Sequence, residues 1–380
     1  MLRPPAISIP GLDEETDELF KNAVEVVVQY DRSSASLLQR RLDIGYARAA
    51  RLIDQLEAAG VVGPAEGSLP REVLIRSVDD VLGAKQGKAQ DEEWIPQIPP
   101  NYKVPSGLKL SKADSIPWGT SFSDVINRTE FKESKTEFPL HLGFDDDGKL
   151  KTESLFTVNN LIIAGNNLSQ KENLVDTVLL TYLLRYGPSE LKLILIDPTR
   201  YLDLYNGIPH LLSPVINDHG KTVSALRWAG YELDRRQKQF SEAGVRDLKA
   251  YNQKMGFTAV PSILIVAFCE FFDVETEDSW IRLTAHSERT GIHSIIIVDR
   301  TTGASLPSTI KSNIPARAVF RLTSASESRA IEVSGAEKLQ PGEAIYKPNF
   351  GNTANLKAIF TPEIDVKEVV EAVKQFSSKV

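Results

Sequence analysis

Short apolar runs separated by amphipathic stretches dominate the chain after residue 118. Continuous apolar runs such as 193–196 and 263–266 have the length of strands and show no polar face. Such strands are typical of a sheet covered on both faces, which is most often a parallel sheet with helices on each side. Strand-like runs, some continuous and some interrupted by polar residues, lie at residues 140–143, 161–164, 191–197, 262–267, 294–298, 316–322 and 343–346. The pattern predicts an α/β domain with a largely parallel sheet.

Residues 13–76 follow a helical pattern instead. Six apolar positions recur at helical spacing in a first helix: Leu19, Phe20, Ala23, Val24, Val27 and Val28. Serines at 33–36 can cap a second helix, and Gly45 turns the chain into a third helix that ends at Gly60. Apolar residues at 61–62 and 73–75 then flank a loop rich in Gly and Pro. Together these elements predict a helix-turn-helix followed by a two-stranded wing.

The remaining segments predict a short tail and a linker. Between residues 77 and 118, glycines and charged residues are followed by prolines at 96, 99, 100, 105 and 117. Prolines at this density prevent a regular helix and favour an extended chain. The expected organisation is a tail (1–12), a small winged-helix domain (13–76), a Pro-rich linker (77–118) and an α/β domain (119–380).

Composition narrows the class of protein. With 380 residues, 42% of them hydrophobic, the chain can form two or three domains with cores. Its single cysteine, Cys269, excludes an internal disulfide and suits a reducing compartment. No apolar run reaches the roughly 20 residues that cross a bilayer, and the five histidines show no paired metal-ligand spacing. We therefore expect a cytoplasmic protein with no membrane segment and no metal site of its own.

The net charge of −7 gives no support to nucleic-acid binding, but it averages over domains. Between residues 32 and 51 lie five arginines and one acid, Asp43. Arginine suits phosphates and guanine edges, and the third helix carries several polar residues on one face. We expect double-stranded DNA to contact Arg40, Arg41, Arg48, Arg51 and Gln55. The alternative is a solvated face in a winged-helix module that binds proteins.

A candidate phosphate-binding loop follows the apolar run at 161–164. The pattern G-x-x-x-x-G-K-[ST] binds nucleotides because its amides surround the phosphates, its lysine reaches the β and γ oxygens, and its hydroxyl holds Mg²⁺. The candidate nucleotide-binding residues here are Gly165, Asn166, Asn167, Leu168, Ser169, Gln170, Lys171 and Glu172. Gln170 replaces the second glycine, and its Cβ atom narrows the approach to the phosphates.

ATP is the candidate cofactor, and Glu172, which replaces the hydroxyl, weakens its expected binding. A carboxylate at the positive end of the following helix is worth roughly 0.3–1 kcal/mol without any bound anion. It can bind Mg²⁺, but beside a triphosphate it adds repulsion and disturbs the octahedral geometry. Mg²⁺ is therefore a less favoured ligand than ATP.

Two stretches resemble the FtsK/SpoIIIE family of DNA translocases. Residues 17–74 are similar to the family's γ winged helix, and residues from about 123 to 370 are similar to its motor. Landmarks are Ile44-Gly45-Tyr46-Ala47-Arg48-Ala49-Ala50-Arg51, Ile196-Asp197-Pro198, Glu232-Leu233-Asp234-Arg235-Arg236 and Gly335-Ala336-Glu337-Lys338-Leu339. The resemblance implies a RecA-like P-loop fold and binding to duplex DNA. The family normally has its winged helix last, and it commonly has Asn where Ala47 stands, which bears on its sequence preference.

The family's catalytic elements differ here. The family ends one strand in an Asp-Glu pair, which assists Mg²⁺ and polarises water, and the resemblance places Cys269 and Glu270 there. A thiol is a poor magnesium ligand. The next strand is followed by Asp299, an acid in place of a neutral phosphate sensor. A neighbouring subunit's arginine is a further family feature. Candidates are Arg289, Arg300 and Arg317, unless these form surface ion pairs.

The sequence leaves three functions open. The first is an FtsK-like DNA-binding protein, related to proteins of chromosome partition and cell division, that hydrolyses little or no ATP. It would form homo-oligomers or join active relatives. The second is an active ATP-driven translocase that works through Lys171 and Glu270. The third is a sequence-specific regulator whose P-loop domain only oligomerises.

Overall fold

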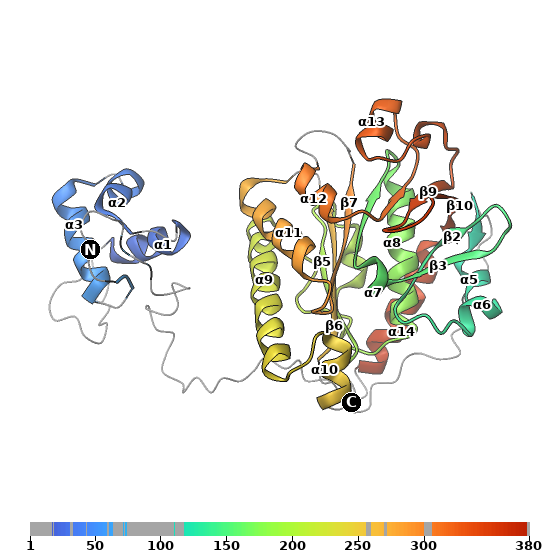
Figure 1. Cartoon of the computed structure of the whole chain (residues 1–380), viewed down its shortest axis with the longest axis horizontal. Coiled ribbons are helices and arrows are strands. Elements are labelled where there is room, and N and C mark those ends of the chain that lie inside the picture. The colour runs from blue at the N-terminus through green and yellow to red at the C-terminus, as the bar shows by residue number, and fades with distance from the viewer. Residues whose placement is uncertain are drawn as a thin grey trace. The chain divides into compact units, whose positions relative to one another are not determined.

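The computed structural model describes residues 17, 19–30, 33–42, 44–58, 61–63, 71, 73, 110, 118–255, 260–269, 272–299 and 306–377. The chain divides into two compact units, residues 1–94 and 95–380 (Figure 1). Each unit has its own elements and its own core. The limits of the four predicted segments stay predictions.

Three helices build the described part of the first unit: α1 (Phe20–Tyr30), α2 (Ala35–Leu42) and α3 (Tyr46–Ala58). Their apolar stripes meet in a core that includes Phe20, Leu38 and Leu52. An antiparallel bridge joins Val62 to Val73. The three predicted helices are therefore present, and the bridge lies where the paired strands of the wing are predicted.

A nine-stranded sheet forms the centre of the second unit, with the order β3-β2-β10-β9-β8-β4-β7-β6-β5. Its strands are β2 (Pro139–Phe144), β3 (Leu150–Ser154), β4 (Asn160–Ala164), β5 (Leu191–Ile196), β6 (Ser262–Cys269), β7 (Ile292–Val298), β8 (Arg317–Val319), β9 (Glu343–Lys347) and β10 (Ala354–Lys357). The five strands from β8 to β5 pair in parallel, whereas β9, β10, β2 and β3 extend the sheet in antiparallel fashion. The prediction of an α/β domain with a parallel-rich sheet is confirmed.

The apolar pattern misses the strands that are not buried on both faces. In β3 and β10, most residues are half-buried or exposed. Their sequences, LKTES and ANLK, contain no continuous apolar run. A further two-stranded sheet pairs β1 (Thr120–Ser121) with β11 (Ile359–Phe360) in parallel. These short, partly solvated strands depend on their neighbours for stability, which residue preferences alone do not reveal.

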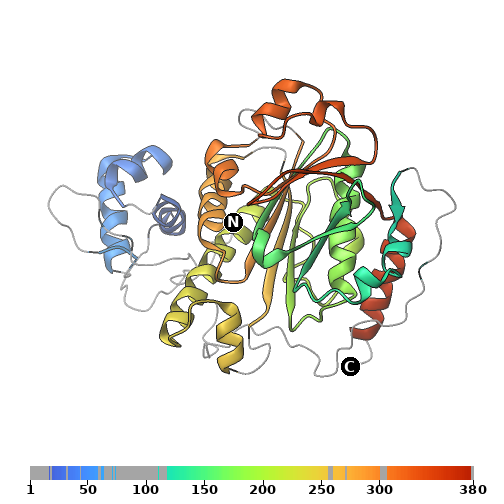
Figure 2. The ribbon, with the colours of Figure 1, turned by 45° about the vertical axis from the view of Figure 1, so that its right-hand side comes forward.

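Helices cover both faces of the sheet. Figure 2 shows α8 (Leu168–Leu183) and α14 (Glu363–Ser377) on one side, and α9 (His219–Glu242) and α11 (Val274–His286) on the other. Side chains of β4 alternate between the two cores: Leu161 and Ile163 pack on the first, Ile162 and Ala164 on the second. This double burial is the reason that the parallel strands read as continuous apolar runs.

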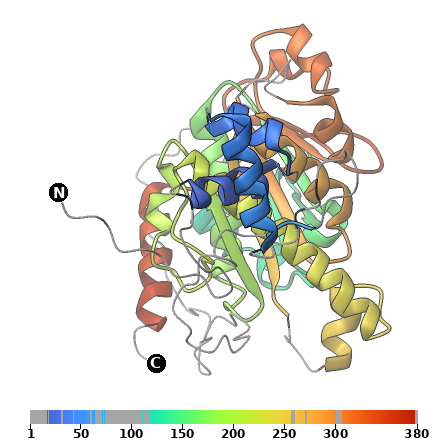
Figure 3. The ribbon, with the colours of Figure 1, turned by 90° about the vertical axis from the view of Figure 1, so that its left-hand side faces the viewer.

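The shorter helices connect these layers. They are α5 (Phe122–Val125), α6 (Thr129–Lys132), α7 (Leu155–Val158), η1 (Tyr201–Tyr205), α10 (Leu248–Met255), α12 (Ser308–Asn313), α13 (Ala325–Ala330) and η3 (Ala336–Lys338). Figures 1 and 3 show α13 and α10 at opposite ends of the unit. Within the described part of the chain, no helix combines the length and hydropathy that a bilayer crossing requires.

Candidate nucleotide site and candidate DNA-binding helix

The candidate phosphate-binding loop connects the carboxyl end of β4 to α8. The strand ends at Ala164 and the helix begins at Leu168, so three residues lie between them. Asn167 caps the helix, because its side-chain oxygen accepts a hydrogen bond from the N–H of Gln170 (3.3 Å). Residues 168–172, predicted as part of a nucleotide loop, thus form the first turns of α8. The connection is short and already stabilised by its own cap.

Gly165 has a packing role. A Cβ atom at this position would lie 2.7 Å from the Cβ atom of Phe320, which follows β8. The N–H of Asn166 donates to the Arg321 carbonyl (2.9 Å), and the N–H of Phe320 donates to the Ala164 carbonyl (2.8 Å). The loop is thereby joined to the strand beside it. The glycine is required by this close approach whether or not a phosphate binds.

Lys171 lies in the interior and is 0% exposed. Its ammonium donates to the Val298 carbonyl (3.3 Å) and forms an ion pair with the Asp299 carboxylate. Both partners lie at the carboxyl end of β7, which pairs in parallel with β4. A buried ammonium is unfavourable without a compensating anion. Here Asp299 of the same chain supplies that anion.

Glu172 lies near Asp197, which follows β5. Burial first, and then the Asp197 carboxylate, raise the pKa of Glu172 to about 6, although Lys171 acts in the opposite direction. Asp197 is fully buried and accepts hydrogen bonds from the backbone N–H groups of Thr199 (2.9 Å) and Leu202 (2.7 Å). Two carboxyl groups therefore share the surroundings of this end of the helix, which disfavours a further negative charge beside them.

A buried acid lies one turn further along α8. The hydroxyl groups of Tyr201 and Tyr205 in η1 donate hydrogen bonds to the two carboxyl oxygens of Asp176. The bond from Tyr205 Oη to Asp176 Oδ1 is 2.7 Å long. Burial raises the pKa of Asp176 to about 7, against the effect of these two hydrogen bonds. The sequence interpretation missed this network. The i, i+4 spacing of two tyrosines after a strand end was the available signal.

The second catalytic element lies at the end of β6. Its last residue is Cys269, and burial raises the pKa of this thiol to about 12, so the thiol is neutral. The predicted catalytic residue Glu270 lies outside the described residues. Asp273 caps α11 by accepting hydrogen bonds from the N–H groups of Glu275 (3.0 Å) and Thr276 (2.9 Å). In the described ranges, no group of three His, Cys, Asp or Glu side chains is placed to hold a metal ion.

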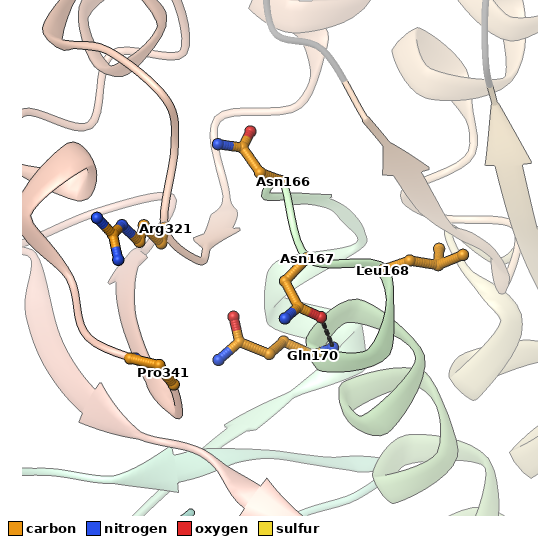
Figure 4. Close-up of a pocket in the computed structure, with 6 residues that line it drawn as sticks. All are labelled: Asn166, Asn167, Leu168, Gln170, Arg321 and Pro341. Atoms are coloured by element: carbon orange, nitrogen blue, oxygen red, sulfur yellow. Dashed lines mark hydrogen bonds between the residues drawn. The ribbon is translucent and has the colours of Figure 1, made fainter.

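A pocket of about 390 Å³ lies beside the start of α8. It is lined by Asn166, Asn167, Leu168, Gln170, Arg321 and Pro341. Figure 4 shows Arg321 and Pro341 on one side, and Asn167 and Gln170 on the other. Four of the eight predicted nucleotide-binding residues thus share one pocket, while Lys171 does not line it.

On helix α3, two of the predicted DNA contacts have partners within the unit. Arg48 donates through Nε and Nη2 to the Asp17 carboxylate (2.8 and 2.6 Å), and this lowers the pKa of Asp17. Gln55 accepts a hydrogen bond from the N–H of Asp17 (3.4 Å). These bonds stabilise the start of α1 against α3, so contact with DNA would have to share or break them.

The other candidates are exposed. Arg51 of α3 is exposed and donates through Nε to the Ala47 carbonyl (3.3 Å). Arg40 donates through Nε to the Ser36 carbonyl (3.2 Å), and Arg41 is exposed on the same helix. Tyr46, which is not among the predicted DNA contacts, is 66% exposed at the first position of α3.

The three arginines predicted to act across a subunit interface have different surroundings. Arg317 is 1% exposed and donates to Glu332 (3.0 Å) and to the Lys311 carbonyl (2.9 Å). Arg289 is exposed, and Arg300 lies outside the described residues. A role for Arg317 in a neighbouring subunit would require it to leave these bonds, whereas Arg289 would need no such change.

Comparison with known proteins places these features in a family. The FtsK/SpoIIIE family matches residues 121–344, and the Ftsk gamma domain matches residues 14–76. The chain belongs to the FtsK/SpoIIIE family. The DNA translocase FtsK of Caldanaerobacter subterraneus subsp. tengcongensis is 34% identical over 262 residues, which cover 66% of this chain and 37% of that protein. The DNA translocase FtsK of Clostridium acetobutylicum is 33% identical over 392 residues, covering 99% and 50%.

The chain spans half or less of the length of these two FtsK relatives. Among solved structures, the pCW3 conjugation coupling protein TcpA, in its monomer form with ATPγS, has a similar fold with a TM-score of 0.54. It is 17% identical, and the similarity covers 88% of this chain and 87% of TcpA. In this FtsK/SpoIIIE member, the gamma match precedes the motor match.

Sequence interpretation did not find Arg321 or Pro341 as neighbours of the FtsK-like loop. The parallel pairing of β8 with β4 brings the carboxyl ends of both strands to the same edge of the sheet. Ligands in such sheets bind beyond the carboxyl ends of strands. The order of the strands was the missing information, since β4 and β8 lie far apart in the chain.

Proposed function

We propose that this FtsK/SpoIIIE member binds double-stranded DNA and that its P-loop domain hydrolyses little or no ATP. The observation that carries this proposal is the buried ion pair between Lys171 and Asp299, together with the bond from Lys171 to the Val298 carbonyl. A phosphate-binding lysine must be free to meet the β and γ oxygens. Here its charge is already neutralised inside the chain.

Other features of the site support weak hydrolysis. Phosphoryl transfer depends almost entirely on positioning and on stabilising the developing negative charge. At this site Glu172 replaces a hydroxyl and shares its surroundings with Asp197, while Cys269 is a neutral thiol. These changes remove ligands for Mg²⁺ and add negative charge where a triphosphate would bind. The similar fold of TcpA, solved with ATPγS, supports nucleotide use by this type of domain.

The exposed residues of α3 and the names of the relatives support DNA binding. Arg51 and Tyr46 are exposed on the helix that enters the groove in winged-helix proteins. The two relatives compared above are named DNA translocases. We infer a cytoplasmic protein related to chromosome partition and cell division, which forms homo-oligomers or joins active FtsK-like subunits.

Steady-state ATP hydrolysis with duplex DNA and Mg²⁺ tests the proposal. The full chain is compared with Lys171→Ala and Asp299→Asn. We expect the wild type to show no DNA-stimulated turnover above the Lys171→Ala background, because the lysine does not meet the phosphates. DNA-stimulated turnover that Lys171→Ala abolishes would overturn this conclusion.

The second candidate function is an active translocase. The identity of 33–34% to the two DNA translocases favours it. It requires Lys171 to leave Asp299 when nucleotide binds, and it predicts turnover in the same assay. It also predicts that a neighbouring subunit contributes an arginine, for which Arg289 is exposed in this structure.

DNA binding is tested separately by titrations at several salt concentrations. We expect Arg51→Ala to weaken binding and to reduce the slope of log K against log salt by about 1, since one phosphate contact is lost. Arg227→Ala, an exposed arginine on α9 of the other unit, is the matched control. If neither substitution changes DNA binding, Arg51 of α3 does not contact DNA. Binding that selects one sequence at constant salt would favour the regulator hypothesis.

A further inference from the structure

The pocket beside α8 contains a polar group that has no partner. Gln170 is 2% exposed, and its side-chain Nε2 makes no hydrogen bond. A buried N–H donor without an acceptor costs about 1–3 kcal/mol, so native structures rarely retain one without a reason. Figure 4 shows the Gln170 amide between Asn167 and Pro341, directed into the pocket that these residues line. The unpaired donor therefore lies in the wall of this pocket.

Arg321 lines the same pocket, and Figure 4 shows its side chain extending away from Asn167 and Gln170, so its guanidinium has to turn toward them to meet an anion. Arg321 follows β8, and its carbonyl accepts the N–H of Asn166 (2.9 Å), which holds its backbone against the loop. Its side chain is exposed, and none of the ion pairs in the described residues involves it. Arginine presents several N–H groups in a plane and binds oxyanions through two bonds at once.

The third contribution comes from α8. The helix has 16 residues, and its first-turn amides have no partners within the helix. Asn167 satisfies the amide of Gln170, while the amides of Leu168 and Ser169 lie at the positive end of the helix. A buried donor, an arginine and a helix N-terminus thus meet at a single pocket.

We propose that this pocket binds a phosphate-bearing anion without Mg²⁺, held by Arg321, the Gln170 amide and the first turn of α8. This inference deepens the proposed function and rests on it, since Lys171 remains paired with Asp299 while the anion is bound. Arg321 and the first-turn amides of α8 offer only N–H donors, and Gln170 adds its unpaired Nε2, a set that suits an oxyanion rather than a cation. Its volume of about 390 Å³ falls in the range of small-molecule sites.

The site differs from a working phosphate loop in a way that can be measured. In a working loop, the lysine and Mg²⁺ provide the positive charge. Here the positive charge comes from Arg321, which follows the strand β8 beside the loop, and the glutamine that replaces a glycine becomes a ligand. The structure therefore assigns Gln170 a binding role instead of a purely disruptive one.

The test uses the full chain in EDTA at constant ionic strength. Isothermal titration measures the affinities for inorganic phosphate, pyrophosphate and ATP. We expect saturable binding by at least one of them. We expect Arg321→Ala to weaken it at least tenfold and Gln170→Leu to weaken it several-fold. The double variant Lys171→Met/Asp299→Asn, which removes the ion pair without changing the net charge, should change the affinity less than twofold, and so should the control Arg227→Ala.

The outcomes separate the possible ligands. If ATP binds and pyrophosphate does not, the ligand is a nucleotide. If pyrophosphate or phosphate binds, the anion itself is the ligand. The absence of saturable binding in EDTA overturns the inference. Loss of binding in Lys171→Met/Asp299→Asn overturns it as well, because net charge is unchanged in that variant and the lysine would then be the ligand. An equal loss in Arg227→Ala also overturns it, because the effect would then follow net charge.

The inference and the proposed function can fail separately. Hydrolysis is measured with Mg²⁺ and DNA, whereas anion binding is measured in EDTA without DNA. If the protein shows no DNA-stimulated ATP hydrolysis and also binds no anion, only the inference is refuted. DNA-stimulated ATP hydrolysis that depends on Lys171 refutes the proposed function and removes the basis of the inference.

Discussion

Lys171 lies where a phosphate-binding lysine is expected, but its ammonium is already bonded within the chain. Its ammonium is buried and paired with Asp299, whose own side chain is 60% exposed. The two partners are therefore unequal. Removing the carboxylate leaves a buried charge behind, whereas removing the ammonium leaves a carboxylate that water can solvate.

This asymmetry predicts the effects of two substitutions on stability. Asp299→Ala should lower the free energy of unfolding by about 1–3 kcal/mol, because the ammonium of Lys171 loses its anion. Lys171→Met keeps a similar volume and should cost less than about 1.5 kcal/mol. Denaturant titrations of both variants measure the difference. Equal losses for the two would show that the ion pair is not what keeps Lys171 in place.

At the scale of elements, the connection between β4 and α8 determines the conformation of the candidate phosphate-binding loop. It is short, capped by Asn167 and bonded to the segment after β8. Its conformation is stabilised by packing and by hydrogen bonds within the chain. A loop stabilised in this way keeps its conformation with or without a bound anion.

Gly165→Ala tests this packing. The new Cβ atom would meet the Cβ atom of Phe320 at 2.7 Å, so we expect a loss of about 1–3 kcal/mol in unfolding free energy. Gly230→Ala on α9 is the control, because its nearest atom would be a side-chain nitrogen at 3.7 Å. That change should be neutral or stabilising, since alanine favours helix by about 1 kcal/mol over glycine. Similar destabilisation by both would refute the steric explanation.

The contact between α8 and η1 predicts a dependence on pH. Asp176 has a pKa of about 7 in the folded state, above the ordinary value of 3.8. The folded chain holds this proton more tightly, so the stabilisation is complete below about pH 4 and is lost as the pH rises towards 7. The other groups facing Asp176 are Tyr201, Tyr205, Glu172 and Glu363.

Chemical denaturation of the wild type and of Asp176→Asn at several pH values measures this effect. Buried histidines, such as His293 with a pKa lowered to about 3, change stability in the opposite direction in part of this range. The difference between the two proteins cancels their contribution. We expect the stability of the wild type, relative to Asp176→Asn, to fall between about pH 4 and pH 7. A constant difference would show that Asp176 is ionised in the fold.

At the scale of the whole molecule, the chain contains separate cores. Leu52 lies in the core of the first unit, and Leu264 lies in a core of the second. The chain divides into these units between residues 94 and 95. Units with separate cores unfold independently unless they share a large interface.

This organisation predicts two unfolding transitions in calorimetry. Leu52→Ala should destabilise the first unit by about 2–5 kcal/mol and shift one transition only. Leu264→Ala should shift the other, since both side chains are 0% exposed. A common shift of both transitions in either variant would mean that the units unfold as one.

The sequence by itself determined what depends on local pattern. Continuous apolar runs predicted the parallel strands, because such strands are buried on both faces, and helical spacing predicted the three helices of the first unit. Gln170 and Glu172 also showed a departure from the phosphate-binding pattern, and the family resemblance placed Cys269 where the family has an aspartate.

Only the tertiary structure decided which residues meet. The pairing of β7 and β8 with β4 brings Asp299 to Lys171 and Arg321 to the loop. The bond between Asp17 and Arg48 likewise joins segments 31 residues apart. Strand order and helix packing are set by the burial of the whole core, which no local stretch of sequence contains. For that reason, the sequence could show that the lysine had been kept, but not that its charge was already paired.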